Sequence, residues 1–250
     1  KKIPIMLIAS RRQIDCDELG GGYVEKWSTE KFSKYVRNKN RNIILCRDHG
    51  GPWQSDLERK ERFGLREAME SAKKSYKVDI DAGFQILHLD PSIDVHGPIS
   101  VEEGLERLFE LYDFCCNYAK KQGKEIIYEI GTEEQTGSTN SQEELHFTLS
   151  KICEFCEKNK YPKPTFVVIQ TGTKVKELRN IGSLDSPFRV KKEIPPEIQI
   201  PQMINICKKY QIYMKEHNAD YLSDEVLSWH PKLGIHSANV APEFGVTETK

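Results

Sequence analysis

The chain has 250 residues, of which 30% are charged and 38% are hydrophobic, an ordinary balance for a globular protein with a sizeable core. Its 37 basic and 38 acidic residues give a formal net charge of -1, which excludes a global attraction to nucleic acid or to an anionic membrane. No apolar run in the sequence approaches the ~20 residues of a membrane span. The seven cysteines form no regular framework, which is typical of reduced thiols, so we expect a cytoplasmic protein.

Short apolar runs alternate with longer helical patterns along the chain. Strands are predicted at Ile3–Ala9, Ile43–Cys46, Phe84–Leu89, Glu125–Ile130 and Thr165–Gln170, with weaker signals at Ala219–Leu222 and Leu233–His236. Helices are predicted at Ser28–Arg37, Leu57–Tyr76, Val101–Gln122, Gln142–Asn159 and Ile198–His217. Because the strand signals are continuously apolar, they indicate parallel strands that are covered on both faces. Strand followed by helix, repeated, predicts an α/β fold.

Two α/β architectures compete, an open doubly wound sheet and a closed barrel. The glycine triplet Gly20–Gly22 comes too late after the first strand to be a dinucleotide-binding fingerprint. Polar clusters follow nearly every strand, and a barrel would bring them all to one mouth. We therefore predict a single domain over residues 1–250, a TIM (β/α)8-type barrel. Since only seven strand signals are found, we expect the barrel to be trimmed by one strand at the N-terminus and incomplete at one or both ends.

The first polar cluster follows the strand at 43–46 directly. It contains Arg47, Asp48 and His49, then two glycines. Adjacent residues of a strand point in different directions, so one of Asp48 and His49 could bind a metal while the other handles a proton. The alternative is a plain turn in which Asp48 bonds to local amides.

A second cluster, His88-Leu89-Asp90-Pro91-Ser92, follows the third strand. His88 and Asp90 are two residues apart and so share one face of an extended strand, an arrangement that suits proton transfer or the binding of a substrate hydroxyl. The alternative is a buried His–Asp pair that ends the strand.

Carboxylates gather at the end of the fourth strand. Glu129 lies inside an apolar run, where an isolated carboxylate would be costly to bury and therefore needs a partner. Glu133 lies in the following loop and could act as a general acid or base, or simply be solvated.

The last two strand ends carry small polar residues. Gln170 and Thr171 could supply hydrogen bonds to a phosphate, although a plain strand exit fits equally. His236, Ser237 and Asn239 come late in the chain, where barrels often hold phosphate, and His236 is a candidate imidazole ligand.

Taken in order, these motifs resemble one family, the class II tagatose-bisphosphate aldolases, and in particular their larger, accessory subunit, often called non-catalytic. The segments that carry the resemblance are IASRRQID with GGGYV, then CRDHGGPWQ, FQILHLDPS and YEIGTEE. The closing segment GIHSANVAPEFGVTET matches only loosely: His236 stands where the family tends to have lysine, and Arg11-Arg12 replace a small polar pair.

The resemblance implies a role for several of these residues. YEIGTEE is also similar to the segment of catalytic class II aldolases whose glutamate binds zinc. By that similarity Glu129 is the metal ligand, with His49 and His236 as imidazole ligands and Asp48 as the proton-transfer acid. We predict that His49, Glu129 and His236 converge at the carboxyl ends of the strands.

Our leading hypothesis is a metal-dependent aldol cleavage or condensation of a phosphorylated sugar, with a divalent ion, zinc by expectation, as cofactor. Asp48, Asp90 and Glu133 are the candidate catalytic residues. The candidate substrate-binding residues are Arg11, Arg12, Arg47, Gln170, Thr171, Ser237 and Asn239. The second hypothesis is a non-catalytic barrel that stabilises a catalytic aldolase subunit, and a homo-oligomer is also possible. A third is a metal-independent barrel enzyme that acts on a sugar or nucleotide sugar.

Overall fold

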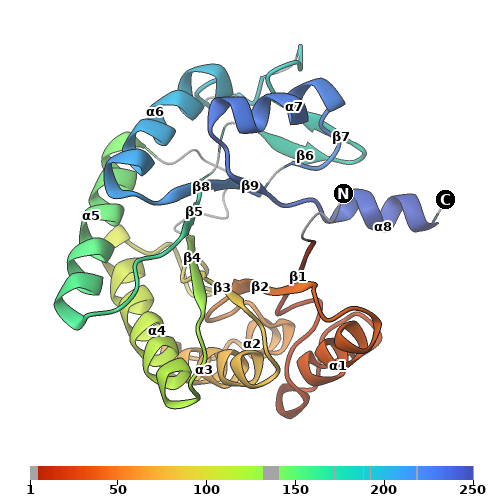
Figure 1. Cartoon of the computed structure of the whole chain (residues 1–250), viewed down its shortest axis with the longest axis vertical. Coiled ribbons are helices and arrows are strands. Elements are labelled where there is room, and N and C mark those ends of the chain that lie inside the picture. Colours follow the sequence, from red (N-terminus) through yellow and green to blue (C-terminus); the bar gives the residue numbers. More distant parts are fainter. Residues whose placement is uncertain are drawn as a thin grey trace. The chain divides into compact units, whose positions relative to one another are not determined.

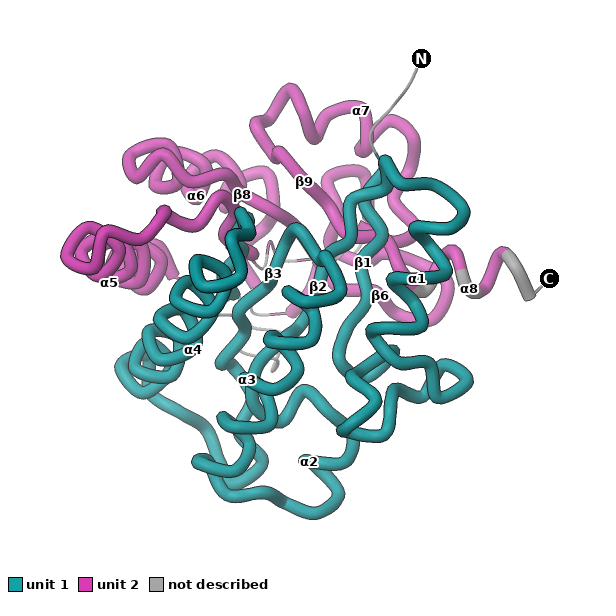
Figure 2. Tube along the Cα trace, turned by 60° about the horizontal axis from the view of Figure 1, so that its bottom comes forward, with its two compact units in different colours: residues 1–131 teal, residues 132–250 magenta. Residues whose placement is uncertain are grey.

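The computed structural model describes residues 5–131, 141–169, 171, 173–187, 189–191, 193–217 and 219–249. The chain divides into two compact units, residues 1–131 (unit 1) and residues 132–250 (unit 2), which are coloured separately in Figure 2. Among the helices in these ranges, none combines the length and the apolar character needed to cross a membrane.

Unit 1 is built on four parallel strands in the order β1-β2-β3-β4. The strands are β1 (Met6–Ser10), β2 (Ile44–Gly50), β3 (Ile86–Leu89) and β4 (Ile127–Gly131). The helices are α1 (Thr29–Lys39), α2 (Asp56–Lys60), α3 (Leu65–Asp81) and α4 (Val101–Lys121), labelled in Figure 1. Strand neighbours follow chain order, as in successive βα units.

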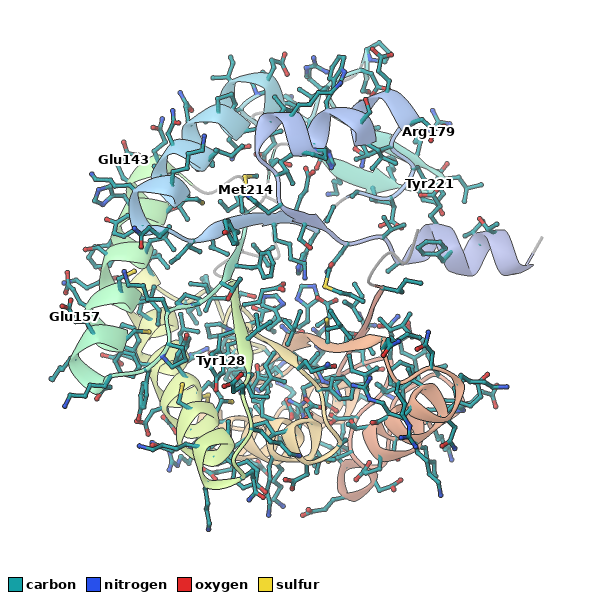
Figure 3. All side chains as sticks on the ribbon, in the orientation of Figure 1. Tyr128, Glu143, Glu157, Arg179, Met214 and Tyr221 are labelled. Atoms are coloured by element: carbon teal, nitrogen blue, oxygen red, sulfur yellow. The ribbon has the colours of Figure 1, made fainter. Side chains whose placement is uncertain are left out.

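Local chemistry explains where the helices of unit 1 begin. Ser28 accepts a hydrogen bond from the backbone N–H of Lys31 and so caps α1. At α4, Ser100 and Glu103 form a reciprocal capping box. The apolar faces of the helices then cover the sheet, and all four residues of β3 are buried. Tyr128 of β4, labelled in Figure 3, packs its ring 4.7 Å from that of Tyr112 on α4.

Unit 2 contains three parallel strands in the order β5-β8-β9 and an antiparallel pair, β6-β7. In chain order the elements are α5 (Gln142–Asn159), β5 (Phe166–Val168), β6 (Lys174–Lys176), β7 (Arg179–Ile181), α6 (Pro196–Tyr210), β8 (Tyr213–Glu216), α7 (Asp224–Leu233), β9 (Ser237–Ala238) and α8 (Pro242–Thr249). A capping box of Ser141 and Glu144 starts α5. The side chains of Glu143 and Glu157, labelled in Figure 3, lie on its exposed face.

The five strong strand predictions are confirmed, with shifts of a few residues at their ends. The prediction of one helix at Leu57–Tyr76 is wrong, because Gly64 separates α2 from α3. The helix predicted at Ile198–His217 ends at Tyr210, since Gln211 adopts a left-handed conformation, and β8 follows.

The two weak strand predictions fail for different reasons. Residues 219–222 form no strand; the Asp220 carboxylate there accepts the backbone N–H groups of Ala241 and Glu243 at the start of α8. The strand predicted at residues 233–236 is displaced, because Gly234 ends α7 in a left-handed conformation and β9 begins only at Ser237.

The predicted α/β class is confirmed, because both units contain parallel strands and helices. Barrel closure, the eighth strand and the single domain stay predictions.

Candidate functional site

The site in unit 1 is built on an irregularity of β2. Arg47 pairs with Leu87 and Gly50 pairs with Leu89, so β2 carries one more residue than β3 between these two pairs. The extra residue is accommodated as a bulge at Asp48 and His49, and His49 has a positive φ of 40°. Bulges re-aim side chains and are common beside functional sites.

The bulge brings two neighbouring side chains to the same place. Asp48 Oδ2 lies 3.8 Å from His49 Nε2, and Asp48 Oδ1 lies 3.6 Å from His88 Nδ1 on β3. The ligand atoms that Asp48, His49 and His88 offer all lie within 4.8 Å of one another. The expectation that Asp48 and His49 point in different directions is therefore wrong, because it assumed a regular strand.

The orientation of His49 is fixed by Asp90. His49 Nδ1 lies 2.7 Å from Asp90 Oδ2, and the backbone N–H of His49 donates to His88 Nδ1 at 3.1 Å. Burial would raise the pKa of Asp90, but the hydrogen bond and charge of His49 outweigh it, and the pKa is lowered. The lowered pKa keeps Asp90 ionised at neutral pH.

Glu129 lies next to this group rather than in it. The register of β3 and β4 pairs it with His88, so both side chains share one face of the sheet, and Glu129 Oε1 lies 3.8 Å from His88 Nδ1. The Glu129 side chain is 1% exposed. Its role as a metal ligand stays a prediction.

The donor set fits a divalent transition metal. One carboxylate and two imidazoles are ligands that zinc takes, and ligands held at ~2.0–2.2 Å from one ion lie at most about 4.4 Å apart. The distances from Asp48 to His49 and His88 meet this condition. A metal on His88 Nδ1 would replace the hydrogen bond from the His49 backbone.

The loop after β2 is held tightly against the residues that follow β3. Gly51 has a φ of +130°, and a Cβ atom there would come within 2.1 Å of the backbone oxygen of Asp90. Gln54, further along the same loop, donates from Nε2 to Asp90 Oδ2 at 2.7 Å. Gly51 thus allows backbone to approach backbone, whereas Gly50 leaves room for the side chain of Tyr76.

Arg47 serves the core. Its guanidinium pairs with Asp79 through two hydrogen bonds, of 2.8 and 2.6 Å. The three remaining N–H groups donate to Thr29 and to the backbone oxygens of Ala9 and Ile14. Since all five donors are used and the residue is 1% exposed, the predicted phosphate contact has no support in its geometry.

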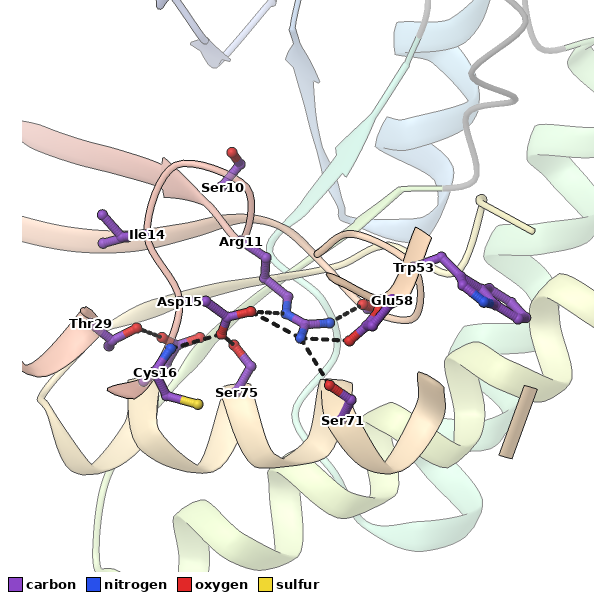
Figure 4. A network of polar contacts seen from close by, with 12 residues as sticks. Ser10, Arg11, Ile14, Asp15, Cys16, Thr29, Trp53, Glu58, Ser71 and Ser75 are labelled. Atoms are coloured by element: carbon purple, nitrogen blue, oxygen red, sulfur yellow. Dashed lines mark hydrogen bonds and ion pairs between the residues drawn. The ribbon is translucent and has the colours of Figure 1, made fainter. Parts of the chain in front are cut away.

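Arg11 is occupied in the same way, as Figure 4 shows. It donates to Asp15, Glu58, Ser71 and the backbone oxygen of Gly51, and its side chain is fully buried. The predicted phosphate role of Arg11 therefore also lacks support. Arg12 differs, because its side chain is 50% exposed. Its Nε lies 3.1 Å from Oδ1 of Asp56, an exposed residue at the start of α2.

Unit 2 has a polar cluster of its own. Glu216, the last residue of β8, accepts the hydroxyl of Thr171 and lies 3.3 Å from His230 Nε2 on α7. Burial lowers the pKa of His230. The Thr171 hydroxyl is thus directed at a protein carboxylate, and its predicted role in substrate binding stays a prediction.

His236 does not lie where the sequence placed it. It precedes β9, its backbone N–H donates to Met214 near the start of β8, and its ring packs 4.3 Å from that of Tyr213. It is exposed and lines a cavity of about 370 Å³ at the amino ends of these strands. The sequence placed His236 at the carboxyl end of a strand, whereas within unit 2 it lies at the amino end of β9. The convergence of His236 with His49 and Glu129 stays a prediction.

The other predicted residues are accounted for as follows. Ser237 lies in β9, and the backbone N–H of Asn239 donates to the carbonyl of Glu216. Glu133 and Gln170 lie outside the described residues. Two members of the site were not among the predicted site residues, His88 and Gln54. The signal for His88 was the strand face that it shares with Asp90, and the signal for Gln54 was its place at the end of the segment CRDHGGPWQ.

The fold and site together define a class, α/β proteins with parallel strands and a His–carboxylate cluster at strand ends. Among solved structures, the chain is similar to a probable tagatose 6 phosphate kinase from Sinorhizobium meliloti 1021, with a TM-score of 0.76 at 20% identity over 98% of this chain and 59% of that one. It is also similar to the YdjI aldolase from Escherichia coli K12, with a TM-score of 0.56 at 14% identity over 99% of this chain and 69% of that one. No curated protein sequence matches it.

The family is narrower than the fold. A family model described as D-tagatose-1,6-bisphosphate aldolase subunit GatZ/KbaZ-like matches residues 22–157, more than half of the chain. The chain belongs to this family. The matched range includes every member of the unit 1 site.

Proposed function

We propose that this protein is a metal-dependent, class II aldolase-like protein that cleaves or forms a carbon–carbon bond of a phosphorylated sugar. The observation that carries the proposal is the cluster of Asp48, His49 and His88, whose ligand atoms lie within 4.8 Å of one another. Membership of a family described by a sugar bisphosphate aldolase supports the choice of substrate class. The structural similarity to the YdjI aldolase shows that a fold of this kind occurs in an aldolase.

In this proposal His49 and His88 hold a divalent metal, and the nitrogen-rich donor set favours zinc. A bound metal would polarise the substrate carbonyl and stabilise the enediolate. Glu129, beside His88, is a further proposed ligand. The finer fold, a (β/α)8-type barrel, is proposed because strands and helices continue to alternate through both units.

Asp48 is the proposed proton carrier. Its side chain is 15% exposed, so the carboxylate can reach a bound substrate, and it lies within 4 Å of both histidines. In cleavage it would take the proton from the carbinol hydroxyl as the carbon–carbon bond breaks; in condensation it would return that proton.

Loss and return of metal test the proposal. We expect chelator-treated protein to lose cleavage of D-tagatose 1,6-bisphosphate and to regain it with zinc. His49→Gln should bind zinc at least about 10–100-fold more weakly, the range found when metal sites are perturbed, and His146→Gln should not, because His146 is exposed on α5 and pairs with Tyr210. Zinc titration followed by calorimetry measures both.

A second candidate function is that of an accessory subunit, which the family description as an aldolase subunit favours. Its proposed partner is a catalytic aldolase chain. Zinc titration, a cleavage assay and mixing with such a catalytic chain separate the two functions. Purified protein that binds no zinc and cleaves nothing, yet raises the activity or stability of the catalytic chain, would support the accessory role.

Arg12 is the proposed phosphate contact. Among the three arginines predicted to bind phosphate, it is the one with a half-exposed side chain. We expect Arg12→Ala to raise KM for a sugar phosphate by about tenfold, the size of one charge-assisted hydrogen bond, and to leave an unphosphorylated analogue unaffected. Arg66→Ala is the control, since Arg66 pairs with Glu70 and Glu110 on exposed helix surfaces. Equal effects on both substrates would remove Arg12 from phosphate binding.

A further inference from the structure

The Asp90 carboxylate is surrounded by hydrogen-bond donors. Oδ2 is 2.7 Å from both His49 Nδ1 and Gln54 Nε2. Oδ1 accepts the backbone N–H of Ser92 at 3.0 Å and its hydroxyl at 2.5 Å. The Asp90 side chain is 3% exposed. Because the Gln54 amide nitrogen and the Ser92 backbone N–H can only donate, an ionised carboxylate satisfies this environment, and an amide would turn its NH2 toward another donor.

This arrangement determines which nitrogen of His49 carries a proton. An ionised carboxylate at 2.7 Å requires a proton on Nδ1, and in the neutral ring the lone pair is then on Nε2. Nε2 is the atom that lies 3.8 Å from Asp48, on the side of the proposed metal site. Partners of this kind orient histidine ligands in many metal proteins.

Asp90 is itself held from two sides. Gln54 is 2% exposed and belongs to the loop whose Gly51 packs against the backbone of Asp90. The carbonyl of Gly51 in turn accepts a 2.7 Å hydrogen bond from Arg11. The loop therefore has little room to withdraw the Gln54 amide from the carboxylate.

We propose that Asp90 is a positioning residue, held by Gln54 and Ser92, which fixes His49 as the Nδ1–H tautomer and so presents Nε2 to a divalent metal. This assigns Asp90 a role through His49 instead of the direct catalytic role that the sequence suggested. The part of the inference that concerns metal rests on the proposed function; the tautomer is a property of the metal-free protein.

The tautomer can be measured directly. In metal-free protein, ¹⁵N chemical shifts of the histidine rings distinguish Nδ1–H from Nε2–H, and the His49 signals are those absent from His49→Gln. We expect the Nδ1–H form to predominate. In Asp90→Asn the ratio of Nδ1–H to Nε2–H should fall about tenfold or more, as expected for loss of a hydrogen bond to a charged group. Gln54→Met should lower it in the same direction but less.

Asp94→Asn is the matched control. It removes one negative charge from the same segment and breaks the 2.7 Å contact with Arg107, but it does not touch His49. We expect it to leave the His49 tautomer and the zinc affinity unchanged, whereas Asp90→Asn should weaken zinc binding about 10–100-fold. A purely structural role for Asp90 would instead make the two variants alike.

Two results would overturn the inference. One is a predominant Nε2–H tautomer of His49 in the unsubstituted protein, a measurement that does not depend on the folding of any variant. The other is an Asp90→Asn protein with unchanged zinc affinity. Absence of aldol cleavage together with the expected tautomers would refute the proposed function while supporting the positioning role.

Discussion

Replacing Arg47 with Met is expected to lower the free energy of unfolding by about 3–5 kcal/mol, the cost of breaking a buried ion pair by removing one partner. The substitution keeps a long side chain in the core but leaves the Asp79 carboxylate buried without its guanidinium. Urea unfolding followed by circular dichroism measures the loss.

A double substitution separates the ion pair from simple packing. In Arg47→Met with Asp79→Leu, both charges are gone, and most of the lost stability should return, because an apolar pair of similar volume often replaces a buried ion pair at little cost. If the single variant is as stable as the unsubstituted protein, Arg47 is not a core residue and its phosphate role regains support.

Asp48→Asn is expected to slow aldol cleavage about 10²–10⁴-fold, the usual contribution of a general acid or base. Asn keeps the shape of the side chain but exchanges no proton at neutral pH. Asp17→Asn removes the same charge from an exposed carboxylate that lies 3.6 Å from Lys31, and it should not change the rate.

Zinc content identifies how Asp48 acts. A variant that is slow but still binds zinc supports proton transfer by Asp48. A variant that loses both zinc and activity identifies Asp48 as a metal ligand, a role that its distances to both histidines also allow. Turnover like that of the unsubstituted protein would exclude Asp48 from the mechanism.

The sequence predicted the parts of the fold that depend on local patterns. The strands of unit 1 were predictable because each contains a short apolar run. The strand Tyr213–Glu216 was not, because its Tyr-Met-Lys-Glu sequence continues the helical pattern of α6. Only the left-handed backbone of Gln211 separates the two, and glutamine gives no such signal.

The site shows the same limit. Asp48, His49 and Asp90 were recognised from residue type and from their place after strands. Their geometry depends on the bulge in β2, which is a matter of pairing with β3 and leaves no mark in the sequence. The arginines were misassigned for a related reason: a guanidinium after a strand suits both a phosphate and a buried carboxylate, and Asp79, which pairs with Arg47, is distant in sequence.

The contacts of Arg11 have a consequence for how the unit 1 site would meet a ligand. One side chain ties the turn after β1 to the loop after β2, to Glu58 of α2 and to Ser71 of α3. These segments cannot rearrange separately, so their conformational entropy is lost when the chain folds and not when a substrate arrives. Such preorganisation makes the site rigid before binding, and rigid sites favour affinity and correct alignment over adaptability.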